Sequence, residues 1–203
     1  MKIKLTFSLC FIFYLLTSCA SKYRVIEPEK IKYISKNEDD NVRIEYKYDL
    51  LHKKYRKKEE KKDIKLVAFK ITNNTERDLM LGRDITIQFS DGKEAQIVDS
   101  KRVFEELKQE PGWYLFYLLL TPLNFYTTNS NGESSSSTPI GLILGPGLAA
   151  GNLLGASGAN KNFEKELMLY DIYGMEIPKG KSKYGLLGIK SDSYETLNVK
   201  VKE

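Results

Sequence analysis

The sequence has very few of the residues that build metal sites and disulfides. Its 203 residues include two cysteines, Cys10 and Cys19, and one histidine, His52. A zinc site made from cysteine and histidine needs three or four such ligands, and a disulfide framework needs paired cysteines in the mature chain. We therefore expect no metal site, no cofactor and no disulfide.

Motifs of the common enzyme classes are also missing. Ser157 does not have the Gly-x-Ser-x-Gly spacing of a nucleophile elbow, and His52 lies in a charged run. Gly180-Lys181-Ser182 has the end of a phosphate-binding loop, but Met175 stands where the first glycine is required. The net charge of +5 is too small to indicate nucleic-acid binding. We expect no enzyme, with a glycosidase-like carboxylate pair as the alternative.

The apolar run at the start of the chain is too short to cross a membrane. Leu5–Leu16 has no charge, but it covers about twelve residues and a spanning helix needs about twenty. Lys2 and Lys4 precede it, and the small residues Thr17 and Ser18 follow it. A positive end, a short apolar core and small residues are typical of a secretory signal peptide.

The residues around Cys19 make this prediction more specific. Leu16 lies three positions before Cys19, and two small residues lie between them. This pattern resembles the signal of bacterial lipoproteins. The resemblance implies cleavage between Ser18 and Cys19, a diacylglycerol on the Cys19 thiol and an acyl chain on its new amino group. Two or three acyl chains anchor a protein stably to membrane lipid. The signal implies an extracytoplasmic location. The residue after Cys19 is Ala20 and not an acidic residue, which in Gram-negative lipoproteins goes with transfer to the outer membrane, so the resemblance favours the outer membrane over the inner membrane.

After a signal peptide at 1–18, the sequence predicts a lipidated N-terminus and tether at 19–41 and a β-domain at 42–203. The tether is polar and charged, with an edge strand near its end or short strands at Val25-Ile26 and Ile31–Ile34 as alternatives. The charged run at 52–62 is interpreted as a solvated loop, with a basic patch for anionic head groups as the alternative.

Several segments alternate apolar and polar residues with a period of two, which is typical of strands. Val42–Leu50 is the clearest, and Ile64–Thr72 is apolar on both faces, as in a central strand. Asp91-Gly92 predicts a tight turn between strands at 84–90 and 94–98. Further strands are predicted at Phe163–Tyr173, Lys183–Lys190 and Thr196–Lys202.

These elements predict a mainly β fold. A strand ending in Ile71–Thr75, a strand ending at Asp91-Gly92 and the turn Pro178–Gly180 before Tyr184 follow one another. This order is similar to that of immunoglobulin-like lipoprotein domains. The resemblance implies an immunoglobulin-like antiparallel β-sandwich, and it does not determine function.

An insertion at 101–160 interrupts the predicted sandwich. Lys101–Gln109 has the spacing of a short amphipathic helix. From Pro111 to Asn160 the only charged residue is Glu133. Residues 113–126 are rich in aromatic and aliphatic side chains, and they include four candidates for contact with a membrane or a partner: Trp113, Tyr114, Phe116 and Tyr117.

The second half of the insertion, 140–159, is rich in glycine. Gly147, Gly151 and Gly155 recur every four residues, so they would share one face of a helix, and Gly141 and Gly145 have the same spacing. Glycine at such a spacing lets two backbones approach closely. We considered three structures: a helical hairpin packed on the sandwich, a hairpin that enters lipid with Trp113 at the interface, and a flexible loop.

Taken together, the sequence predicts a lipid-anchored protein of the cell envelope. We expect a non-catalytic binding or assembly module with an envelope protein as its partner. The alternative is a membrane-active or self-associating protein that acts through 113–159.

Overall fold

The computed structural model describes residues 19–128 and 134–202. The predicted signal peptide, including Ser18, lies outside the described residues. The chain divides into two compact units, which we call unit 1 and unit 2. Unit 1 contains the residues up to Lys22 and Gln109–Ala159, and unit 2 contains Tyr23–Lys108 and the residues from Asn160 onward.

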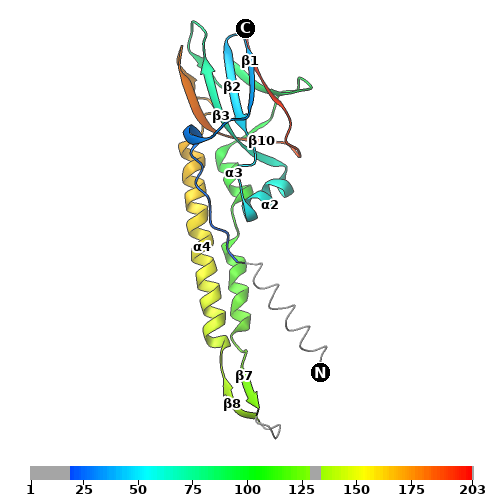
Figure 1. The fold of residues 1–203 in the computed structure, drawn as a ribbon, viewed down its shortest axis with the longest axis vertical. Coiled ribbons are helices and arrows are strands. Elements are labelled where there is room, and N and C mark those ends of the chain that lie inside the picture. Colours follow the sequence, from blue (N-terminus) through cyan, green and yellow to red (C-terminus); the bar gives the residue numbers. More distant parts are fainter. Residues whose placement is uncertain (1–18, 129–133, 203) are drawn as a thin grey trace. The chain divides into compact units, whose positions relative to one another are not determined.

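Unit 2 is built on a five-stranded antiparallel sheet in which the strand order is β1-β2-β3-β10-β6. Figure 1 shows β1, β2, β3 and β10 side by side. The strands are β1 (Ser35–Asp39), β2 (Val42–Lys47), β3 (Ile64–Asn73), β6 (Ile97–Val98) and β10 (Ser182–Lys190).

Two smaller antiparallel pairs complete the β-structure of unit 2. They are β5 (Ile85–Phe89) with β11 (Leu197–Val201), and β4 (Leu79–Met80) with β9 (Glu176–Ile177). One hydrophobic cluster contains alternate residues of β2, such as Ile44, together with residues of β5 and β11. This shared core follows from the period of two in the sequence, because it places every second side chain on the same face.

Most of the predicted strands are confirmed, and the return strand after Asp91-Gly92 is confirmed only in part. Gly92 has the positive φ of +84° that the turn requires. Ala95 then donates its N–H to the Ile87 carbonyl over 2.8 Å, so the chain does return along β5. The chain then turns away from β5, and its next strand, β6, pairs with β10.

Most of the segment that was predicted as a tether, from Tyr23 onward, belongs to unit 2. It contains η1 (Pro28–Lys30) and the edge strand β1, and Ile26 is buried. One oxygen of Glu166, Oε2, accepts hydrogen bonds from the Tyr23 hydroxyl at 2.6 Å and from the Ile26 N–H at 2.9 Å. These residues therefore pack within the domain, and the large sheet begins before Val42.

The charged run that was interpreted as a loop is the helix α2 (Lys53–Lys62). Tyr55 and Glu59, four residues apart, are buried on one face of it. Glu59 Oε1 accepts the Leu66 N–H at 2.7 Å, while Oε2 has no hydrogen-bond partner. Burial is the main reason that the pKa of Glu59 rises to about 7. The packing of this highly charged segment therefore depends on Tyr55 and Glu59.

The amphipathic helix of the insertion is confirmed as α3 (Ser100–Leu107). It begins where the Asp99 carboxylate accepts the N–H groups of Lys101 and Arg102, at 2.9 and 3.2 Å. This is the usual role of aspartate at a helix N-cap.

The strand that was predicted at 163–173 is wrong. Residues up to Leu169 belong to the helix α4 (Gly141–Leu169). Phe163 is fully buried against the rings of Tyr23, Tyr55 and Phe104, with ring centroids 5.1–6.1 Å away. Leu167, four residues further on, is buried on the same side, which is the helical period of 3.6 rather than the strand period of two.

Unit 1 contains η2 (Pro111–Leu120), a 3-10 helix, and the first part of α4. Two of the three structures considered for 113–159 contain two helical segments, and η2 and α4 agree with these two and not with a flexible loop. The polar segment between them forms two antiparallel strands, β7 (Phe125–Thr128) and β8 (Ser134–Thr138), and was not predicted to do so. The fold as a whole mixes helices with antiparallel sheets, so the expectation of a mainly β protein was too narrow.

Candidate functional site

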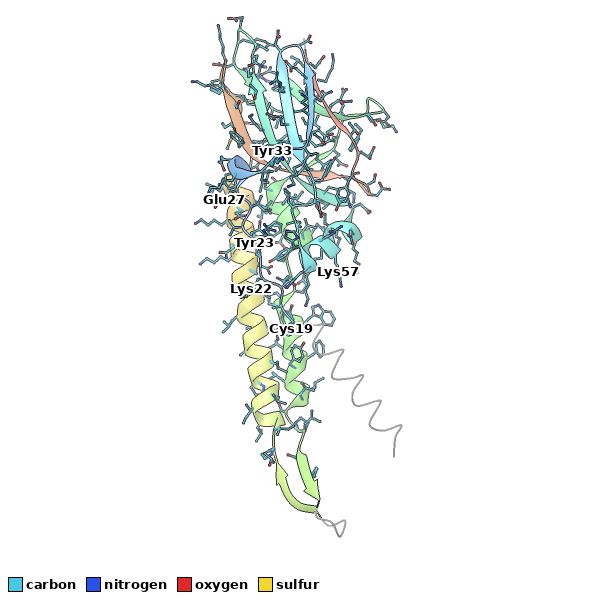
Figure 2. All side chains as sticks on the ribbon, in the orientation of Figure 1. Cys19, Lys22, Tyr23, Glu27, Tyr33 and Lys57 are labelled. Carbon is cyan, nitrogen blue, oxygen red and sulfur yellow. The ribbon has the colours of Figure 1, made fainter. Side chains whose placement is uncertain are left out.

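Cys19, the predicted lipidation site, is an exposed free cysteine in unit 1. Figure 2 labels it beside η2. The next residue is fixed to α4, because the Ala20 N–H donates to Asn152 Oδ1 over 2.5 Å. Asn152 is itself held by its Nδ2, which donates to the Leu148 carbonyl at 2.8 Å. The chain directly after the cysteine is therefore attached to the middle of the glycine-rich helix.

A second pair of hydrogen bonds holds Ser21. Its N–H donates to Gln109 Oε1 at 2.9 Å, and Gln109 Nε2 donates back to the Ser21 carbonyl at 2.6 Å. Both residues are buried. This pairing satisfies the backbone groups of Ser21 as a strand partner would, so unit 1 determines the position of the segment that follows Cys19.

Unit 1 has a small core of its own between η2 and α4. It consists of Tyr114, Tyr117, Ala149 and Ala156. The two tyrosine rings are stacked, with centroids 6.4 Å apart. Of the four aromatic candidates for contact with a membrane or a partner, these two therefore face inward, and only Trp113 and Phe116 face outward.

The outer side of unit 1 is covered by large apolar side chains. Leu119 and Ile143 are 73% and 78% exposed, and the rings of Trp113 and Phe116 are stacked on each other in solvent. We call the following residues the apolar surface: Trp113, Leu115, Phe116, Leu118, Leu119, Leu123, Leu142, Ile143, Leu144 and Leu154. Only two of these residues, Trp113 and Phe116, were predicted from the sequence as contact residues.

No charged side chain interrupts this surface within 111–128 and 134–160. Leu142, Ile143 and Leu144 are consecutive and all exposed, so they point to different sides of the helix. A helix that lies on a membrane surface keeps one polar face, whereas a helix that is apolar all round is typical of a membrane interior or a protein core.

The glycines divide into two groups. A Cβ on Gly141 would lie 2.1 Å from the Leu120 carbonyl oxygen, and one on Gly145 would lie 2.7 Å from Thr121 Oγ1. These two glycines therefore allow η2 and α4 to approach closely. Gly147 and Gly151 have nothing within 4 Å of such a Cβ, and Gly155 meets only Ala20, at 3.6 Å. The predicted close approach exists, but it lies at the earlier glycines.

Within the described residues, α4 is the one helix that is long and apolar enough to cross a membrane. Only 28% of its most apolar window is buried. A helix in the core of a soluble protein would be mostly buried, so the exposed fraction favours contact with lipid or with another protein.

No group of three metal-binding side chains occurs in the part of the chain that the structure describes. His52 lies beside Arg24, whose Nη1 is 3.4 Å from the His52 Nε2 atom.

Comparisons of the chain with protein-family models, with curated proteins and with solved structures give no match. Its function is therefore inferred from the residues and their geometry.

Proposed function

We propose that this protein is a bacterial lipoprotein anchored through acyl chains on Cys19, and that the helical part of unit 1 enters the membrane beside this anchor. Unit 2 stays in water as a non-catalytic binding or assembly module of the cell envelope, with an immunoglobulin-like β-sandwich fold. The observation that carries the proposal is the charge-free apolar surface of unit 1, next to the residue that the sequence marks for lipidation.

The energy of exposing this surface to water supports the proposal. Moving a buried leucine or phenylalanine side chain into water costs about 1.5–3 kcal/mol. Ten large side chains that are 45–78% exposed would together cost on the order of 10 kcal/mol, which is comparable to the whole stability of a domain, about 5–15 kcal/mol. Lipid removes this cost.

The dimensions of α4 also fit a bilayer. From Asn152, which holds Ala20, to Gly141 the helix rises about 16 Å. The hydrocarbon core is about 30 Å thick, so each leaflet contributes about half of that. With the acyl chains starting at the level of Asn152, the first turns of α4 would reach the middle of the bilayer.

The positions of Gly147, Gly151 and Gly155 also support membrane insertion of unit 1. Gly155 lies against Ala20, and Gly151 and Gly147 continue from it along one face with open space above them. Acyl chains that leave Cys19 toward the membrane would lie close to these glycines. The three glycines would then provide room for lipid rather than for a second helix of this chain.

A second function, self-association in the membrane, is favoured by β7 and β8. These two strands pair only with each other among the described residues. Their outer edges carry backbone groups without sheet partners, and such edges are unfavourable in hydrocarbon unless another strand pairs with them. A second copy of the chain could supply that strand.

Vesicle flotation of the mature chain with Cys19→Ala tests insertion separately from acylation. We expect this protein to float with vesicles of phosphatidylethanolamine and phosphatidylglycerol. Adding Ile143→Asp should reduce the partition coefficient into the vesicles roughly 100-fold, because an aspartate in the bilayer centre costs about 2.5–3.5 kcal/mol.

Met168→Asp is the matched control. Met168 is 56% exposed on the same helix, but it belongs to unit 2. We expect it to float as the Cys19→Ala protein does. Equal loss in both aspartate variants, or a Cys19→Ala protein that stays unbound, would refute insertion by unit 1. For a chain that does insert, disulfide cross-linking of Thr127→Cys chains in vesicles would decide whether two copies pair through β7.

A further inference from the structure

Unit 2 contains a cavity of about 660 Å³ that the proposed function does not use. One wall is the segment 24–35, and the other is the end of β2 with the residues up to His52. Its volume lies within the range of sites that bind small molecules, about 300–1,000 Å³. Figure 2 labels Glu27, one of the residues that line it.

The charges along this cavity are unbalanced in favour of cations. Both acidic residues that line it are already paired, Glu27 with Lys30 and Asp49 with Arg56. Arg24 and Lys47 form no ion pair with any residue that the structure describes. The cavity therefore offers two uncompensated positive charges to an anion.

His52 helps to position one of these charges. A guanidinium group can only donate hydrogen bonds, so Arg24 Nη1 donates to His52 Nε2 across 3.4 Å. This contact leaves the remaining N–H groups of the guanidinium free to form paired hydrogen bonds with two oxygens of one anion, a geometry that suits phosphate.

The rest of the lining is apolar. Val25 and Ile34 are 58% and 79% exposed at its rim, whereas Ile26 and Leu50 are buried. An inorganic anion would leave these rim side chains in water. A ligand with an anionic head and an apolar body would cover them and meet the cations at the same time.

The chain itself limits how far this cavity can lie from a lipidated Cys19. Four residues lie between Cys19 and Arg24, and an extended chain covers at most about 18 Å over the five steps from one to the other. We propose that the cavity binds an anionic phospholipid, with its phosphate at Arg24 and Lys47 and the start of its acyl chains against Val25 and Ile34. The choice of a lipid rests on the proposed membrane anchor.

The test uses the full mature chain with Cys19→Ala and without vesicles. The probe is dihexanoyl-phosphatidylglycerol below its critical micelle concentration, and binding is followed by the amide NMR shifts of residues 24–35 and 46–52. We expect saturable shifts there and at least tenfold weaker binding of dihexanoyl-phosphatidylcholine. Arg24→Gln and Lys47→Gln should each weaken binding about tenfold. Lys32→Gln, an exposed cation outside the lining, is the matched control and should bind as the parent chain does.

Three results would overturn the proposal. They are equal binding of the two lipids, unchanged binding after both glutamine substitutions, or glycerol 1-phosphate binding as tightly as the lipid. Displacement of the lipid by a polyglutamate peptide at equal concentration would instead assign the cavity to an acidic peptide. A chain that binds the short-chain lipid but fails to float with vesicles would refute insertion by unit 1 and leave this site intact.

Discussion

The carboxyl group of Glu59 has an unpaired oxygen inside unit 2, and this gives the protein a pH dependence. The pKa of the group is about 7 in the folded chain, against 4.5 for the exposed group. Between these two values the unfolded chain has already released the proton that the folded chain still holds. The free energy of unfolding therefore falls as the pH rises from about 4.5 to 7, and it stays low above pH 7.

We expect Glu59→Gln to remove this loss. Glutamine keeps an oxygen that can accept the Leu66 N–H but cannot become charged. Urea unfolding of the Cys19→Ala chain at pH 5, 6, 7 and 8 should show the variant gaining stability over its parent by up to about 3 kcal/mol at pH 8. Glu60→Gln, at the exposed neighbouring position, is the control and should keep the parental pH dependence. Parallel curves for parent and Glu59→Gln would contradict the assignment.

The aromatic residues of η2 follow a three-residue period that separates the buried side chains from the exposed ones. A 3-10 helix has three residues per turn, so Tyr114, Tyr117 and Leu120 lie on one side and Trp113 and Phe116 on another. Tyr114 and Tyr117 belong to the small core of unit 1, and the partly buried Leu120 packs against it. All four aromatic residues were predicted as one set of contact residues, because the sequence alone does not show that this segment is a 3-10 helix.

At the scale of the elements, the contact between η2 and α4 depends on Gly141 and not on Gly147. Alanine at 141 would place its Cβ 2.1 Å from a backbone oxygen, so the two helices would have to separate. We expect Gly141→Ala to destabilise unit 1 by about 1–3 kcal/mol. Alanine at 147 meets open space and has the better helix propensity, by about 1 kcal/mol.

Thermal melting of the helical circular-dichroism signal, in one detergent for all variants, measures this difference. Gly141→Ala should melt at a lower temperature than the parent chain, and Gly147→Ala at the same or a higher temperature. The opposite order would mean that the close approach of the two segments lies at the later glycines, as the spacing alone suggested.

Strands were predictable where apolar and polar residues alternate, as in β2, β5 and β11, and where a short run is apolar on both faces, as in β3 and β10. β2, β3, β5, β10 and β11 all follow segments predicted as strands. The helix α2 was missed because its charges dominate the composition, and its packing depends on two residues. The end of α4 was misread because Met168, Tyr170 and Ile172 alternate, while the buried positions Phe163 and Leu167 have helical spacing.

For the whole molecule, acylation of Cys19 is the prediction on which the anchor depends. Intact mass spectrometry of the protein made in a bacterial host should give a chain without residues 1–18 that carries the mass of a diacylglycerol and one acyl chain. The Cys19→Ala protein should keep residues 1–18 and gain no lipid mass. An unmodified Cys19 in the wild-type protein would leave the apolar surface of unit 1 as the proposed route to the membrane.

The division of the chain into two units was harder to predict from the sequence than the elements of either unit. The change in composition at Pro111 and Asn160 was visible, and it comes close to the boundaries of unit 1 at Gln109 and Ala159. The inclusion of Ala20 and Ser21 in unit 1 was not visible, because it depends on hydrogen bonds to Asn152 and Gln109, which are distant in the sequence.

Because of those hydrogen bonds, no flexible linker separates the proposed anchor from unit 1. Ala20 and Ser21 are bonded to unit 1 directly after Cys19, so no free length of chain separates the acyl chains from the helices. Any displacement of the lipids would move α4 and η2 directly, because the connection between the anchor and these helices is rigid and not flexible. A few glycines inserted between Cys19 and Ala20 would make this connection flexible while leaving every other contact in place.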